Sequence, residues 1–174
     1  MKDTQRTSHS ALAYVALGSN LGESRRIVLD AIARLQDFSA GPIQKSSPWQ
    51  TIPVDCPPGS PHFVNAVVAL APLPGETPES LLKKLRRLET KFGRAPKKVL
   101  NEPRPLDLDL IAFGDATRNT PELVLPHPRA HLRRFVLQPL SEIAPDLILP
   151  GQTQTVAELL AGLAENESVT RLEP

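Results

Sequence analysis

The chain has 174 residues, of which 40% are hydrophobic and 22% charged, a composition typical of a single folded globular domain. Its 20 lysines and arginines and 19 aspartates and glutamates leave a formal net charge of +1, which excludes a strong global attraction to nucleic acid or an anionic membrane. No apolar run approaches the roughly 18 residues that cross a bilayer, and the single Cys56 excludes an internal disulfide. We therefore expect a monomeric protein of the reducing cytoplasm that binds neither nucleic acid nor membrane.

The beginning of the chain predicts a tail followed by a strand. The polar residues 1–10 predict a mobile tail, followed by a single domain over 11–165 and a C-terminal tail over 166–174. Within the domain, an apolar run over 11–17 stops at the Gly-Ser-Asn sequence of 18–20, which predicts a first strand that is ended by turn residues.

A helix and two strands are predicted next. Apolar residues at helical spacing predict a helix over about 23–37, with Ser24 as its N-cap. Residues 44–51 predict a weaker strand, and residues 52–61, which contain four prolines, predict a stiff but irregular loop. Residues 63–70 are rich in β-forming side chains and predict a further strand.

The second predicted helix has clear start and stop signals. The Thr-Pro-Glu sequence at 77–79 supplies an N-cap, an N1 proline and an acidic first turn, and Gly93 follows the last residue of an apolar stripe. Residues 94–105 contain four basic residues and three prolines without periodicity, and they predict a long loop that closes as a lid. Residues 106–113 alternate in polarity and predict a strand.

This order of strand, helix, strand, strand, helix, strand predicts a ferredoxin-like α+β domain, in which an antiparallel sheet carries both helices on one face. A short strand over 123–125, a helix over 132–143 that contains Pro139, and a helix over 156–163 follow. We expect these additions to cover the other face of the sheet, so that helices lie on both faces.

Asp107 and Asp109 alternate with leucines over 106–110 and carry the strongest chemical signal. Because alternate side chains of a strand share a face, both carboxylates project the same way, with their Cα atoms about 7 Å apart. Two such charges repel unless a cation lies between them, and hard oxygen ligands suit Mg²⁺. The alternative is an ordinary solvated sheet face.

Basic side chains precede this pair in the loop, namely Arg94, Lys97, Lys98 and Arg104. Carboxylates that hold a metal, together with mobile cations, are what a polyphosphate site requires, although a charge run of this kind also suits a solvated loop. His127 stands between two prolines and is a candidate donor to a phosphate, the alternative being an exposed histidine in a turn.

Taken together, these motifs resemble those of the 6-hydroxymethyl-7,8-dihydropterin pyrophosphokinase family over about residues 12–160. The Gly-Arg pair at 93–94 and the Pro-Arg-Pro-Leu-Asp-Leu-Asp-Leu segment at 103–110 carry most of the resemblance. Further segments agree with it in order and spacing, namely Ala-Leu-Gly-Ser-Asn-Leu-Gly at 16–22, Phe-Val-Asn-Ala at 63–66, Pro-His-Pro at 126–128, Arg133 and Phe-Val-Leu-Gln-Pro-Leu at 135–140.

The resemblance implies a ferredoxin-like enzyme that moves pyrophosphate from ATP to a pterin alcohol, with AMP as the leaving group. It implies two Mg²⁺ ions as cofactors, held by Asp107 and Asp109, and a catalytic set made of Arg94, Arg104, Asp107 and Asp109. ATP would lie against Glu89, Lys97, Lys98, His127 and Arg133. The pterin would contact Thr51, Ile52, Val54, Phe63, Asn65 and Phe135, and the physics agrees, because an amide can read the edge of a flat ring while an aromatic ring covers its face.

The chain departs from the family in the 94–105 loop. Many members carry a second arginine where this chain has Pro96, and an Arg-Trp pair where it has Leu100 and Asn101. Lys97 or Lys98 would replace the lost charge. The missing tryptophan affects the contact of the lid with the pterin more than the type of reaction.

Two other functions remain open on the residues alone. RNA-recognition domains share this order of strands and helices, but here the central strands offer only Tyr14 and Phe63 for stacking, and the net charge is near zero. A metal-dependent phosphohydrolase would use the same aspartate pair with water as the nucleophile.

Overall fold

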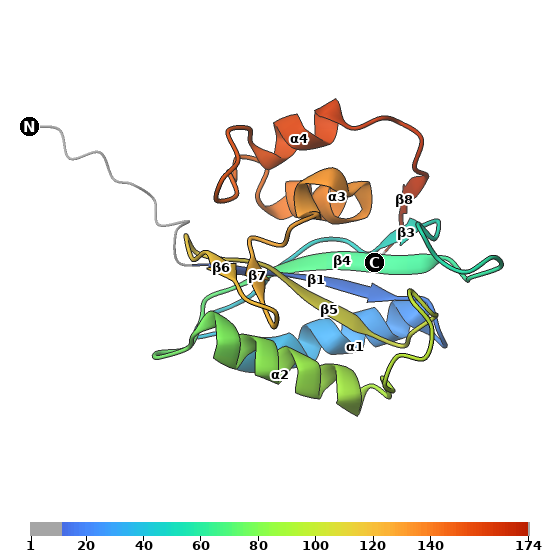
Figure 1. Ribbon diagram of the computed structural model, residues 1–174, viewed down its shortest axis with the longest axis horizontal. Coiled ribbons are helices and arrows are strands. Elements are labelled where there is room, and N and C mark those ends of the chain that lie inside the picture. The colour runs from blue at the N-terminus through green and yellow to red at the C-terminus, as the bar shows by residue number, and fades with distance from the viewer. Residues whose placement is uncertain (1–11, 174) are drawn as a thin grey trace, which may run out of the picture.

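Residues 12–173 are described by the structure, a computed structural model, and they form an antiparallel sheet that is covered by helices on both faces (Figure 1). The core elements are β1 (Ala13–Ser19), α1 (Ser24–Leu35), β3 (Trp49–Thr51), β4 (Phe63–Leu70), α2 (Pro78–Lys91) and β5 (Asp107–Phe113). Their strands lie in the order β5-β1-β4-β3, and each neighbouring pair is antiparallel. This arrangement confirms the predicted ferredoxin-like α+β fold.

The remaining elements extend the sheet or cover its second face. They are β2 (Gln44–Lys45), β6 (Arg118–Asn119), β7 (Val124–Leu125), α3 (Arg134–Ile143), α4 (Val156–Gly162) and β8 (Val169–Arg171). Figure 1 shows α1 and α2 on one side of the sheet and α3 and α4 on the other, as predicted. Within residues 12–173, no helix combines the length and the apolarity needed to span a membrane.

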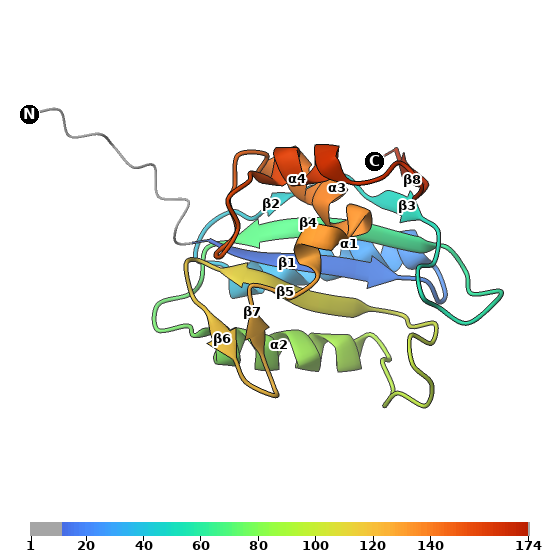
Figure 2. The same cartoon turned by 45° about the horizontal axis from the view of Figure 1, so that its top comes forward.

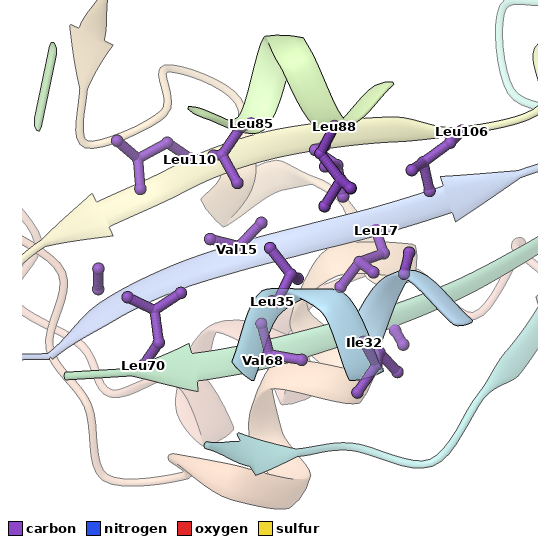
Figure 3. Packing of buried hydrophobic residues seen from close by; sticks show 14 of the residues in the cluster. Val15, Leu17, Ile32, Leu35, Val68, Leu70, Leu85, Leu88, Leu106 and Leu110 are labelled. Carbon is purple, nitrogen blue, oxygen red and sulfur yellow. The ribbon is translucent and has the colours of Figure 1, made fainter. Parts of the chain in front are cut away.

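Alternation along the strands gives the sheet two buried faces. On β1, Val15 and Leu17 belong to the layer under α1 and α2, whereas Tyr14 belongs to the layer under α3 and α4. Ile32 and Leu35 of α1 close the first layer against side chains from three strands (Figure 3). Burying each leucine of this kind contributes about 1.5–3 kcal/mol, so the first layer holds the strands that carry the polar residues described below.

Helix α2 forms where its sequence signals predict. The Thr77 side chain accepts the Ser80 main-chain N–H at 3.1 Å, and the Ser80 hydroxyl accepts the Thr77 N–H at 2.9 Å, which completes a capping box. Leu81 and Leu85 are fully buried on the sheet side. Gly93 follows the helix with a φ of +89°, a conformation that glycine adopts without strain.

Two predicted details of the first half are wrong. Ser24 is the first residue of α1, and no side chain caps this helix. The strand predicted over 44–51 is divided into β2 and β3, because the Ser46 hydroxyl accepts the main-chain N–H of Val67 at 2.9 Å, and Pro48 has no N–H to donate. A side-chain oxygen therefore replaces one carbonyl of the expected ladder.

The C-terminal segment is part of the sheet, so the tail predicted over 166–174 is wrong for the residues described. Strand β8 pairs with β3, with Val169 opposite Thr51. The Leu172 N–H donates to the Pro48 carbonyl at 2.9 Å, and the Leu172 side chain packs against the core. Three residues of alternating polarity give too weak a strand signal for a prediction. The tail predicted over 1–10 lies outside the described residues.

One end of the second face is left uncovered by helices. Figure 2 shows α3 and α4 over the sheet, while the loops that follow β3 and α2 both lie at the end of the sheet where β1 finishes. The 52–61 and 94–105 segments contain no helix or strand, as predicted. This end of the sheet is where the polar side chains gather.

Candidate active site

Three strands place polar residues in one row on the face that carries α3. In the sheet register, Gly18 of β1 lies between Asn65 of β4 and Asp107 of β5. Ala16, two residues before Gly18 and on the same face of β1, lies opposite Asp109. Two strand spacings separate Asn65 from Asp107, which puts their backbones about 10 Å apart. An amide and a carboxylate pair therefore face the same space at the distance that a small bicyclic ligand would span.

A cavity of about 260 Å³ opens above this row. It is lined by ten of the residues predicted for the site, namely Thr51, Ile52, Val54, Phe63, Asn65, Arg104, Asp107, Asp109, Arg133 and Phe135. The lining also includes six residues to which the sequence assigned no role in binding, namely Asp55, Cys56, Asn101, Arg129, Leu132 and Glu167. The predicted aspartates and the predicted aromatic and amide residues thus share one hollow.

The amide of Asn65 is fixed by its neighbours. Its Nδ2 donates to the Thr51 hydroxyl at 2.6 Å, so its Oδ1 is left to accept from a ligand. A Cβ at position 18 would lie 3.0 Å from Asn65 Oδ1, and Gly18 therefore allows this side chain to lie across β1. Asn65 and Thr51 are both about 5% exposed or less, which makes the pair a rigid polar spot in a mainly apolar wall.

Aromatic rings lie beside the cationic residues of the cavity. The Arg104 guanidinium lies 5.4 Å from the centre of the Phe63 ring, and the Arg133 guanidinium lies 5.3 Å from the centre of the Phe135 ring. At these distances each ring attracts its guanidinium. The cavity consequently combines flat apolar surfaces with positive charge at their margins.

Asp107 is already neutralised by arginines of the protein. Arg94 Nη1 forms an ion pair with one oxygen of its carboxylate, and Arg104 Nε lies 3.2 Å from the other. Burial raises the pKa of the Asp107 carboxyl, but Arg104 and Arg94 outweigh it and hold that pKa below its usual value. Asp107 is therefore ionised. The sequence predicted a cation beside the aspartate pair, and for Asp107 the guanidinium groups of Arg94 and Arg104 supply this positive charge.

Glu89 and Arg94 lie behind Asp107 and do not line the cavity. Glu89 is 3% exposed and accepts from the Leu108 main-chain N–H at 2.7 Å and from Arg94 at 2.9 Å. Arg86 also donates to Glu89, at 3.1 Å. These contacts tie α2 to β5 and position Arg94, so we interpret Glu89 as a positioning residue.

Asp109 has no such partner. Among residues 12–173, no side chain or main-chain N–H donates to its carboxylate. Burial and the neighbouring charge of Asp107 raise the pKa of Asp109 to about 6. A hard carboxylate that is open toward the cavity and lacks a cation fits a divalent metal that brings further oxygen ligands from a substrate. The described residues contain no cluster of three or more protein ligands that would hold such a metal alone.

His127 lies beside the cavity and is held as a neutral ring. The Arg129 main-chain N–H donates to His127 Nδ1 at 3.2 Å, so the remaining ring proton sits on Nε2. Burial, followed by the charges of Arg133 and Arg129, lowers the pKa of His127 to about 4. At neutral pH this ring is an uncharged donor.

The two loops at the mouth of the cavity contact each other and share one clamp. Asn101 donates to the Asp55 carbonyl at 2.7 Å. Asn20, 2% exposed, accepts the Arg104 N–H at 2.9 Å and donates through Nδ2 to the Pro61 carbonyl at 3.3 Å. Asn20 thus joins the ends of both loops to the end of β1, a role that no local pattern in the sequence indicates.

Lys97 and Lys98 are not brought to this cavity. Both are exposed, and with Arg94 they line a separate hollow of about 250 Å³ under the 94–105 loop. Of the residues predicted for the site, these two, Glu89, Arg94 and His127 therefore do not line the main cavity.

Comparison with known proteins identifies what this chain resembles. Residues 14–145 match the model of the family described as 7,8-dihydro-6-hydroxymethylpterin-pyrophosphokinase (HPPK). A 2-amino-4-hydroxy-6-hydroxymethyldihydropteridine pyrophosphokinase of Pseudomonas aeruginosa is 40% identical over 154 residues, covering 85% of this chain and 89% of that protein. The protein of the same name from Haemophilus influenzae is 37% identical over 168 residues, covering 93% of this chain and 98% of its own length.

Solved structures share the fold. The HPPK-DHPS of Plasmodium falciparum, crystallised with pteroate, superposes with a TM-score of 0.68 over 86% of this chain, at 14% identity. The present chain spans 42% of the length of that protein. At this identity the likeness concerns the fold alone.

Proposed function

This chain belongs to the 7,8-dihydro-6-hydroxymethylpterin-pyrophosphokinase family and transfers pyrophosphate from ATP to 6-hydroxymethyl-7,8-dihydropterin in folate biosynthesis, and we propose that the cavity above β1 is where it does so. The observation that carries this proposal is the row formed by Asn65, Gly18 and Asp107. It puts a fixed amide and an acidic pair about 10 Å apart on one face, so that a pterin read at one edge would present its hydroxymethyl group to the carboxylates.

The pterin would occupy the apolar end of the cavity. The hydrogen bond that Asn65 Nδ2 donates to the Thr51 hydroxyl fixes the orientation of the amide, and Asn65 Oδ1 would accept from an N–H on the edge of the pyrimidinone ring. Phe63 and Phe135 would cover the ring, and Ile52 and Val54 would close the pocket from the loop after β3. A buried amide that loses its partner costs about 1–3 kcal/mol, which makes Asn65 a determinant of affinity.

ATP would extend from Asp109 toward the arginines. Its phosphates carry several negative charges, and Arg104 and Arg133 line the cavity near the acidic pair. His127 would donate through Nε2 to a phosphate oxygen without adding charge. Lys97 and Lys98 would reach the nucleotide only if the 94–105 loop moves, since both now line the separate hollow.

Asp107 and Asp109 would hold two Mg²⁺ ions with the ATP phosphates. When bound, these ions would neutralise phosphate charge and make the pterin alcohol easier to deprotonate. Asp109 is free for this role, whereas Asp107 would exchange part of its contact with Arg94 and Arg104. The arginines released in this way would be available to the phosphates.

In the reaction itself the residues of the chain would act by position and charge. The pterin alcohol oxygen attacks the β-phosphorus of ATP, the bond from that phosphorus to the oxygen bridging to the α-phosphate breaks, AMP leaves with that oxygen and its electron pair, and the alcohol proton passes to solvent. Asn65 and the two phenylalanines hold the acceptor in line, while Arg104 and Arg133 stabilise charge on the leaving side. We further propose that the protein works in the cytoplasm, because its single cysteine leaves it without the internal disulfides of an oxidising compartment, and that it works as a monomer.

Product analysis tests this function against hydrolysis. The phosphohydrolase alternative has no support in the family match. With ATP, Mg²⁺ and the pterin alcohol, we expect AMP and pterin diphosphate in equal amounts, and no AMP without the pterin. Release of free phosphate at the same rate with and without the pterin would contradict the proposal. The Asp109→Asn variant is the control that assigns turnover to this cavity, because it should lose nearly all of it.

A further inference from the structure

Arg129 is a charged residue of the cavity to which neither the motifs nor the resemblance assigns a role. It stands between β7 and α3, directly before the 3₁₀ turn of Ala130–Leu132. It lines the same cavity as Asp107, Asp109 and Arg133. Its main-chain N–H holds His127, so the peptide of this residue is already part of the nucleotide side of the site.

The charge of Arg129 is not matched by a protein carboxylate. Arg104, which also lines the cavity, forms an ion pair with Asp107, but neither Arg129 nor Arg133 has a carboxylate within 4 Å among residues 12–173. Burial and the charge of Arg129 lower the pKa of Arg133, while the aspartates Asp109, Asp107 and Asp55 act in the opposite direction with smaller effects. Arg129 and Arg133 thus line one cavity and repel each other, and an anion bound between their guanidinium groups would relieve this repulsion.

Among the two substrates, only one supplies that anion. The pterin alcohol is uncharged, whereas the triphosphate carries several charges and offers pairs of oxygens that match the fork of a guanidinium. We propose that Arg129 is a further phosphate-binding residue, which contacts the triphosphate of ATP alongside Arg133. This inference rests on the proposed function of the cavity.

Arg129→Gln tests the inference cleanly, because the substitution removes the guanidinium but keeps the main-chain N–H that holds His127. The probe is α,β-methylene-ATP with Mg²⁺, titrated by calorimetry. We expect its dissociation constant to rise about tenfold or more, since charge-assisted hydrogen bonds are lost, and Arg129→Lys to recover part of the affinity. In turnover, the KM for ATP should rise while the KM for the pterin stays unchanged.

Arg134→Gln is the matched control. It removes the same charge from the same segment, but Arg134 donates to the Leu163 carbonyl at 3.2 Å and does not line the cavity. Its affinity for the nucleotide probe should equal that of the wild-type protein. Melting temperatures of all variants without ligand separate loss of fold from loss of binding.

Two results would overturn the inference. Unchanged nucleotide affinity in Arg129→Gln would make Arg129 a surface residue, and an equal loss in Arg134→Gln would make the effect one of overall charge. Either result, obtained with a wild-type protein that forms AMP and pterin diphosphate, leaves the proposed function intact. If Arg129→Gln weakens binding of the probe but the wild-type protein forms no pterin diphosphate, the proposed function is refuted while the phosphate site at Arg129 stands.

Discussion

Asp107 and Asp109 are two residues apart on one strand, yet the protein surrounds their carboxylates differently. Asp107 lies between Arg94 and Arg104, whereas Asp109 forms no ion pair with any lysine or arginine of residues 12–173. The fold therefore stabilises the negative charge of Asp107 but not that of Asp109. The unfavourable surroundings of the Asp109 charge raise its pKa to about 6. We infer that Asp109 is kept for a ligand and that Asp107 serves both the fold and the ligand.

Neutralising each aspartate separates these roles. Asp109→Asn should leave the melting temperature of the ligand-free protein unchanged or raise it, because an unpaired charge is removed, while turnover falls at least about 100-fold. Asp107→Asn should lower the stability by about 1–3 kcal/mol, because two partly buried arginines lose their partner. Thermal unfolding and turnover of both variants provide the measurement. Equal destabilisation by the two substitutions would show that Asp109 is also structural.

The pKa of His127 predicts how stability depends on pH. The folded protein holds this pKa at about 4, against 6.5 for a free histidine, through burial and the charges of Arg133 and Arg129. Between pH 6.5 and pH 4, the unfolded chain therefore binds a proton at His127 that the folded protein does not bind. The contribution of His127 to the free energy of unfolding is fully present above pH 6.5 and is lost as the pH falls toward 4. Its size is on the order of 1 kcal/mol at pH 5, after discounting for partial exposure.

Comparing the wild-type protein with His127→Gln isolates this contribution from that of Asp109, which titrates in the same range with the opposite sign. Denaturant unfolding at pH 7 and pH 5 should show a smaller loss of stability in the variant. If the two proteins lose the same amount, the ring is already protonated in the folded state at pH 5, and the neutral donor assigned to it is wrong.

At the scale of elements, the 94–105 segment is held at its ends and free between them. Asn20 clamps Arg104, and Gly93 follows α2, but Val99 and Leu100 are 56% and 78% exposed. A segment with few buried contacts opens locally at little cost in free energy. Asn101 contacts the 52–61 loop through one hydrogen bond, so the two loops are coupled weakly in the absence of ligand.

Hydrogen exchange is expected to follow the closing of this lid. Without ligands, amides of 94–103 should exchange much faster than those of β1 and β4. The Mg²⁺ complex of α,β-methylene-ATP together with the pterin should slow them, because closure would bury Val99 and Leu100. The exposed N-terminal turn of α1 serves as an internal reference whose exchange should not change. Identical protection of 94–103 with and without both ligands would rule out a lid.

At the scale of the whole molecule, the order of elements followed from the sequence because strong local signals bounded each one. The capping residues of α2 and the alternation of β5 are examples, since both act within a few residues. Strand β8 could not be predicted, because its three residues become a strand only through pairing with β3.

The sequence could predict which candidate residues lie together where one strand or one motif carries them, and could do so less well where distant elements meet. Alternation alone puts Asp107 and Asp109 on one face. The burial of Glu89 against β5 and the turn of Arg94 behind Asp107 depend on how α2 packs on the sheet, which no spacing encodes. For the same reason Arg129 and Asn20 are visible only in three dimensions.

We propose that one cavity binds the pterin at Asn65 and the nucleotide at the acidic pair. The most direct measurement is calorimetry of Asn65→Ala with each ligand, the pterin being titrated in the presence of Mg²⁺ and α,β-methylene-ATP. We expect the variant to bind the pterin roughly 5- to 150-fold more weakly, because a polar edge of the ring loses its partner, and to bind the nucleotide as the wild-type protein does. Equal weakening of both ligands, or unchanged binding of the pterin, would contradict it.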